Sequence, residues 1–169
     1  MARHIELNPL THLTVGTVGP PGQRVFYLQG SRGADLVSLI IEKQQAAMLA
    51  SSLENLLEEL AEKQQATEDR DTVWSDMRLR EPIEPLFRVG NMGLGYNEEF
   101  NRIVVVAYEL VDEGIDPNVV SFWASQFQAQ ALIKRAYETV KAGRPICGNC
   151  GKPIDPDGHF CPGRNGHAK

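Results

Sequence analysis

Two stretches of the chain, LVSLIIEKQQAAML at residues 36–49 and VVSFWASQFQAQAL at residues 119–132, follow one pattern. Each begins with β-branched and apolar residues typical of a strand and continues into residues that favour a helix. Five aligned positions are identical, namely Val37 with Val120, Ser38 with Ser121, Gln45 with Gln128, Ala46 with Ala129, and Leu49 with Leu132. The match indicates an internal duplication and predicts a strand, rather than a helix starting at Pro117, over residues 119–124.

Further matches extend each repeat to three strands and one helix. TVGTVG (14–19) aligns with RVGNMG (88–93), and the apolar runs QRVFYLQ (23–29) and NRIVVVAYELV (101–111) follow them. We therefore expect an α+β fold, in which duplicated strand-strand-strand-helix units form an antiparallel sheet covered by two helices. The predicted domain spans residues 1–143, with halves at about 10–66 and 84–143.

Periodicity and capping residues set the helix bounds. The first helix is expected over roughly Glu42–Gln65, because leucines recur at the 4-3-4 spacing of one helical face. The second is expected over roughly Ser125–Ala142, since Gly143 is a natural C-cap and Pro145 follows it. The charged connector 61–85 is expected to fray from the helix into a surface loop.

Two glycine-rich stretches are predicted to be turns rather than nucleotide-binding loops. GNMGLG (90–95) lacks the GK[ST] of a P-loop and is expected to form a hairpin between two strands. GPPGQR (19–24) suits a type II turn at Pro21-Gly22.

The length and the N-terminal sequence indicate a compact cytoplasmic protein. A chain of 169 residues fits one domain with a small appendage. No apolar run reaches the roughly 18 residues that span a bilayer, and MARHIELNPLTHL lacks the apolar core of a secretory signal. We expect these first residues, including His4 and Glu6, to be loosely structured.

Charge is unevenly distributed along the chain. The net charge is −5, but residues 134–169 carry seven Lys or Arg against three acids, a net +4 that leaves −9 for residues 1–133. The acidic body argues against a general nucleic-acid binder, whereas the basic C-terminal segment keeps a local contact with a polyanion open.

All three cysteines lie in CGNCGKPIDPDGHFC (147–161), with the spacing C-x2-C-x8-H-x-C. Zinc prefers four thiolate or imidazole ligands in a tetrahedron, and reduced thiols are expected in the cytoplasm. The pattern predicts a structural zinc held by Cys147, Cys150, His159 and Cys161 in a zinc-ribbon-like tail, residues 144–169. His167 is the alternative fourth ligand, and metal-free thiols or a redox pair are the alternative interpretations.

The zinc site is expected to be structural rather than catalytic. Three thiolates and one imidazole leave no open position for water. The residues His4 and Glu6 together with Pro145 and Cys147 superficially resemble the signature of zinc deaminases, but a third cysteine already completes a closed site.

Three motifs together carry a family resemblance. VGTVGPPGQRVFYLQ (15–29), EKQQ (42–45) and GRPICGNCGKPIDPDGHFCPGRNGH (143–167) resemble the uncharacterised bacterial family known as domain of unknown function 3090, over nearly the whole chain. The family's tail pattern CxxCG-x-P-[LI]-D-P-x-GHxCP is matched by Cys147, Cys150, His159 and Cys161. The family position of His167 is often aromatic, which favours His159. The resemblance implies no established activity.

The favoured function is a zinc-binding protein-interaction or adaptor module, with an unknown protein partner and no membrane. This hypothesis predicts an exposed apolar patch on the strand RIVVVAYELV (102–111) and leaves a homodimer open. One alternative is nucleic-acid binding through an uncovered sheet and the tail. It requires that five cations lie on one face of the molecule, namely Lys134, Lys141, Arg144, Lys152 and Arg164. Another is an enzyme, which requires a pocket with converging titratable groups; no catalytic residue is assigned.

Substitution Cys161→Ala is expected to remove the zinc and loosen the tail, while residues 1–142 stay folded, because the predicted site then has three ligands instead of four. Elemental analysis should give one zinc per wild-type chain and much less in the variant, with circular dichroism as the control for folding. A variant that keeps one zinc per chain would show that the ligand set is wrong.

Overall fold

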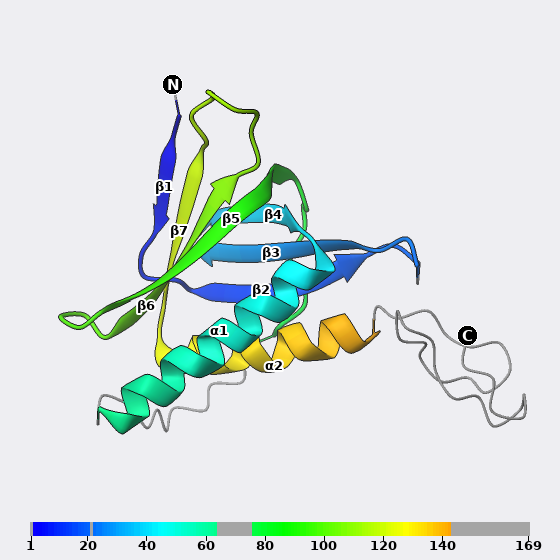
Figure 1. Ribbon diagram of the computed structural model, residues 1–169. Helices are drawn as coiled ribbons and strands as arrows, with labels where there is room; N and C mark the ends of the chain where they lie inside the picture. The colour runs from blue at the N-terminus through cyan, green and yellow to red at the C-terminus, as the bar shows by residue number, and fades with distance from the viewer. Residues whose placement is uncertain (1, 21, 64–75, 143–169) are drawn as a thin grey trace, which may run out of the picture.

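The structure, a computed structural model, describes residues 2–20, 22–63 and 76–142 (Figure 1). Strands and helices follow in the order β1 (His4–Leu7), β2 (His12–Val18), β3 (Val25–Arg32), β4 (Asp35–Ile41), α1 (Lys43–Glu62), β5 (Pro85–Asn97), β6 (Arg102–Glu109), β7 (Val119–Ala124) and α2 (Gln126–Ala142). The predicted α+β class, with two strand-strand-strand-helix units, is confirmed. In this part of the chain no helix is long and apolar enough to cross a membrane.

The seven strands form one sheet in the order β1-β7-β6-β5-β4-β3-β2. Within each unit the three strands are antiparallel, as expected. The sheet as a whole is mixed, because β4 pairs with β5 in parallel and β7 pairs with β1 in parallel. The parallel joint between the units follows from α1, since a helical crossover carries the chain back to the end of the sheet where β4 began.

The N-terminal residues are ordered into a strand, which corrects the expectation of a loose N-terminus. His4–Leu7 forms β1 in register with β7, from His4 beside Val119 to Leu7 beside Phe122, and Leu7 is buried. Although β1 and β2 lie at opposite ends of the strand order, only a short segment separates them in the chain. Within that segment the Leu10 N–H donates to the Trp123 carbonyl on β7 (3.1 Å), so the sheet curls back towards its own start.

The main core lies inside this curl. Its largest fully buried side chains include Leu28 and Leu39 from the first unit and Phe122 and Ile103 from the second. The two units pack tightly at Gly30 on β3, where an added Cβ would lie 2.7 Å from the Phe122 ring. Only glycine leaves room for the aromatic ring at this position.

Both helices start where the repeat predicts. Ser125 caps α2, accepting from the Gln128 N–H (3.0 Å), and its own N–H donates to the Gln128 side chain (2.9 Å). Glu42 likewise donates its N–H to the side chain of Gln45 (2.7 Å). Helix α2 lies along the open edge of β2, where Arg135 Nε donates to the Val15 carbonyl (3.1 Å). Side-chain donors thus satisfy an edge that would otherwise be free to pair with another strand.

The end of the connector is irregular and largely exposed, as expected of a surface loop, and hydrogen bonds hold it on the sheet. We call residues 76–84 the strap. Gln29 and Arg80 form a reciprocal pair, in which Gln29 Nε2 donates to the Arg80 carbonyl (2.9 Å) and the Arg80 N–H donates to Gln29 Oε1 (2.8 Å). Thr14 Oγ1 donates to the Met77 carbonyl (2.5 Å). Burial, with a smaller effect from Arg80, lowers the pKa of nearby His12, so this imidazole stays neutral at neutral pH.

The two glycine-rich stretches differ from each other. GPPGQR forms a turn as predicted, with Gln23 N–H donating to the Pro20 carbonyl (3.0 Å) and Gly22 at φ 86°. GNMGLG is not a hairpin turn but lies inside β5, where Gly93 pairs with Val106 and Gly95 with Val104. The neighbouring strand β6 is long and alternates inward and outward residues, and its pairing with β5 continues through the glycines. The tendency of glycine to form turns does not predict this pairing.

Substitution Gly30→Ala is expected to lower the free energy of unfolding by about 1–3 kcal/mol, because the new methyl group overlaps the Phe122 ring. Gly93→Ala is the matched control, since nothing lies within 4 Å of its added Cβ, and we expect a change within about 0.5 kcal/mol. Urea unfolding of the two variants measures both effects. Equal midpoints would contradict the close approach of the two units.

Candidate interaction surface

Strands β5, β6 and β7 present one face to the core and the opposite face outwards. On β6 the inward residues Ile103, Val105 and Ala107 are at most 1% exposed. The alternating residues Val104 and Val106 are only partly buried, and Tyr108 is 40% exposed. Because side chains alternate along a strand, these residues share the outer face.

Cross-strand pairing brings these residues together on one apolar surface. Val104 lies between Gly95 and Trp123, and Val106 lies between Gly93 and Ser121. The glycines contribute no side chains, so the valines stand unobstructed next to them. We call the set Val104, Val106, Tyr108, Val119 and Trp123, with the two glycines, the outer face.

Exposed apolar residues continue beyond the ends of the strands. Leu110, two residues after Tyr108, is 59% exposed, and Ile115 in the following connection is 57% exposed. The Leu110 N–H donates to the Arg88 carbonyl (2.7 Å), which places it beside β5, where Leu86 is 44% exposed. Exposed apolar side chains are thus found both on the outer face and at this end of the sheet, and exposed apolar patches are typical of binding surfaces.

Charge around the outer face is low and of both signs. His4 and Glu6 lie on β1 beside Val119 and Ser121, and His4 Nε2 is 2.7 Å from Ser121 Oγ. Arg102 begins β6 at the opposite margin. The described residues thus place no row of cations on this face, whereas a surface that binds nucleic acid by its phosphates needs one.

Most of the sequence-predicted site residues lie outside the described part of the chain. These are the zinc ligands Cys147, Cys150, His159 and Cys161, the alternative ligand His167, and the tail cations Arg144, Lys152 and Arg164. Lys134 and Lys141 are exposed on α2, seven positions apart and hence on one side of the helix. Among the residues that the structure describes, no group of three or more His, Cys, Asp or Glu could hold a metal ion.

Two strands of the outer face, residues 102–111 and 119–124, were predicted from the sequence, but the continuation of β5 through its glycines was not. Sequence reasoning singled out residues 102–111 as apolar on both sides, and it took residues 90–95 as a turn. The usable signal was the spacing of the glycines, since Gly93 and Gly95 alternate with larger residues as one face of a strand does.

Comparison with known proteins identifies the family but no activity. The family model described as protein of unknown function (DUF3090) matches residues 5–161. No curated protein and no solved structure gives a significant match. The chain therefore belongs to the DUF3090 family, as the sequence resemblance predicted.

Proposed function

We propose that this member of the DUF3090 family is a protein-interaction module. It pairs with a second copy through the outer face and presents a zinc-clasped tail, residues 144–169, to a further protein partner. The role of the zinc in this proposal is structural, through Cys147, Cys150, His159 and Cys161. A dimer would carry two tails and would bind two partner molecules at once, as an adaptor does.

The exposed outer face is the observation that carries the proposal. Val104, Val106 and Trp123 share one face of the paired strands beside two glycines, and exposed apolar residues, among them Leu110, follow at the end of β6. A contiguous apolar surface of this kind is costly to leave in water and favours association.

A second copy is the occupant that the charges favour. The margin of the outer face carries Glu6 on one side and Arg102 on the other, without an excess of either sign. A surface with an apolar centre and balanced charges does not repel its own copy, and a two-fold contact uses the same surface on both chains. A strongly acidic or basic partner would find no complementary field here.

Substitution Val106→Arg tests this pairing, because it introduces a charge at the centre of the outer face. We expect the wild-type chain to have the solution mass of a dimer and the variant that of a monomer at the same concentration. The matched control is Gln130→Arg on the exposed side of α2, which should remain dimeric. Light scattering after size-exclusion chromatography measures all three masses.

Three outcomes would overturn the proposed pairing. A monomeric wild-type chain would show that the outer face does not bind a second copy. A dimeric Val106→Arg variant would place the dimer contact elsewhere, and loss of the dimer in both variants would show that the effect is not specific to this face.

A further inference from the structure

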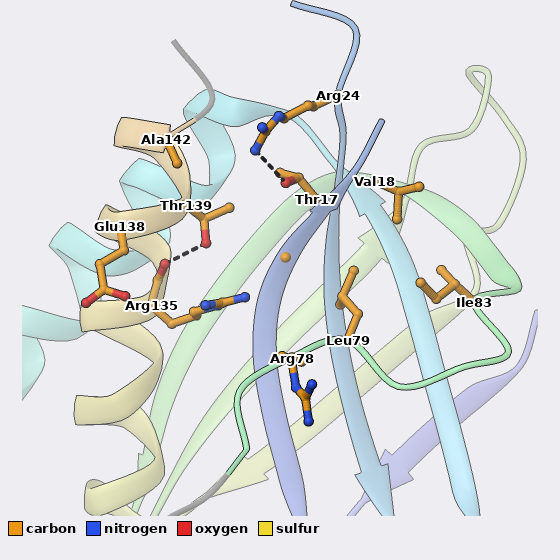
Figure 2. Close-up of a pocket in the computed structure, with 11 residues that line it drawn as sticks. Thr17, Val18, Arg24, Arg78, Leu79, Ile83, Arg135, Glu138, Thr139 and Ala142 are labelled. Atoms are coloured by element: carbon orange, nitrogen blue, oxygen red, sulfur yellow. Dashed lines mark hydrogen bonds between the residues drawn. The ribbon is translucent and has the colours of Figure 1, made fainter. Parts of the chain in front are cut away.

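A cavity of about 390 Å³ lies between the end of β2, the strap and the last two turns of α2 (Figure 2). It is separate from the outer face on β5, β6 and β7. Its volume is in the range of pockets that hold small molecules. Its walls combine apolar side chains, hydroxyl groups and three arginines.

Two of these arginines point into the space between α2 and β2 (Figure 2). Arg135 on α2 donates its Nε to the Val15 carbonyl (3.1 Å), which holds the side chain across the cavity and leaves the other guanidinium nitrogens available. Arg24, which precedes β3, makes a long contact from Nη1 to Thr17 Oγ1 (3.4 Å). The Nε of Arg24 is buried and has no hydrogen-bond partner among the described residues.

The described residues supply no carboxylate partner to Arg24 or Arg135. Glu138 lines the cavity, but its side chain points away from both guanidinium groups (Figure 2). Asp76 pairs with the third arginine, Arg78 (2.7 Å), whose side chain is 82% exposed. The last turn of α2 adds at most about half a negative charge. Two positive charges without a carboxylate partner among the described residues therefore line the same partly enclosed site.

We propose that this cavity binds a small molecule carrying a phosphate monoester, and that Arg24 and Arg135 hold the phosphate. At neutral pH such a group carries a charge of about −1.5 to −2, close to the two positive charges that it would meet. Guanidinium groups bind phosphate oxygens through paired N–H donors, which both arginines offer.

The remaining walls fit the organic part of the ligand. Val18, Leu79 and Ile83 form the apolar side of the cavity, opposite the helix. A phosphate ester with a small apolar group should therefore bind more tightly than inorganic phosphate, because the apolar group adds buried area. A carboxylate of similar size should bind more weakly, because it carries a single charge.

The test is a titration of the full chain with phenyl phosphate, inorganic phosphate and benzoate, followed by amide NMR shifts and calorimetry. We expect affinity to fall in that order, with shifts at Gly16, Thr17 and Arg24 next to the cavity. Arg24→Gln should weaken phenyl phosphate binding about tenfold or more, because a charge-assisted hydrogen bond is lost. Arg102→Gln, on another face of the molecule, should leave it unchanged.

Arg24→Gln is the primary variant because its only hydrogen bond to the described chain is the long one to Thr17, so folding should be preserved. Arg135→Gln is secondary, since loss of its bond to Val15 also weakens the packing of α2. Absence of phenyl phosphate binding at millimolar concentration would overturn the proposal. So would equal affinity for benzoate, or an equal loss in Arg24→Gln and Arg102→Gln.

Discussion

The amide groups of Gln45 and Gln128 hold the duplicated units together. The oxygen of each amide accepts the N–H of the residue that caps its own helix, at 2.7 Å for Gln45 and 2.9 Å for Gln128. The nitrogen of each amide donates to a backbone carbonyl of the other unit, or of the segment that leads into that unit. Gln45 reaches Val89 and Gly90 (3.1 and 2.9 Å), and Gln128 reaches Leu10 (2.8 Å). Only an amide offers an acceptor and a donor on one planar group of this length, so the start of α1 is fixed to β5 and the start of α2 to the segment that leads into β2.

The two units share these glutamine contacts, but they differ in the side chains on the strand faces that point away from the core. In the first unit that face is polar, with Gln29 and Ser38 joined at 3.0 Å, and the strap covers it. The equivalent face of the second unit carries Val104 and Val106 instead, and among the described residues no strap lies on it. The strap therefore covers this face in the first unit, whereas the outer face of the second unit remains available for a partner. The strap also forms a wall of the arginine-lined cavity, so the covering of the first face has created a second candidate site.

Local sequence predicted the repeated elements well because the identical positions each have a structural role. Ala46, Ala129, Leu49 and Leu132 are buried, and the glutamines form the helix starts. Strand β1 escaped prediction because four residues carry too little pattern, and its partner β7 lies far along the chain. The parallel joints depend on pairing between strands far apart in the chain, and the shared cavity of Arg24 and Arg135 depends on how α2 lies against β2, neither of which a local pattern encodes. The zinc ligands remain a prediction from spacing, since they lie outside the described residues.

The most direct test of the central claim is the free energy of unfolding of Gln45→Glu and Gln128→Glu, measured with urea at pH 7. Each change preserves the shape and the capping oxygen but replaces the donating NH₂ with a charged oxygen facing a carbonyl. We expect each variant to lose about 1–3 kcal/mol, whereas the exposed neighbours Gln44→Glu and Gln130→Glu should change stability by less than about 0.5 kcal/mol. If all four variants unfold at the same urea concentration as the wild-type chain, the glutamine amides do not join the two units.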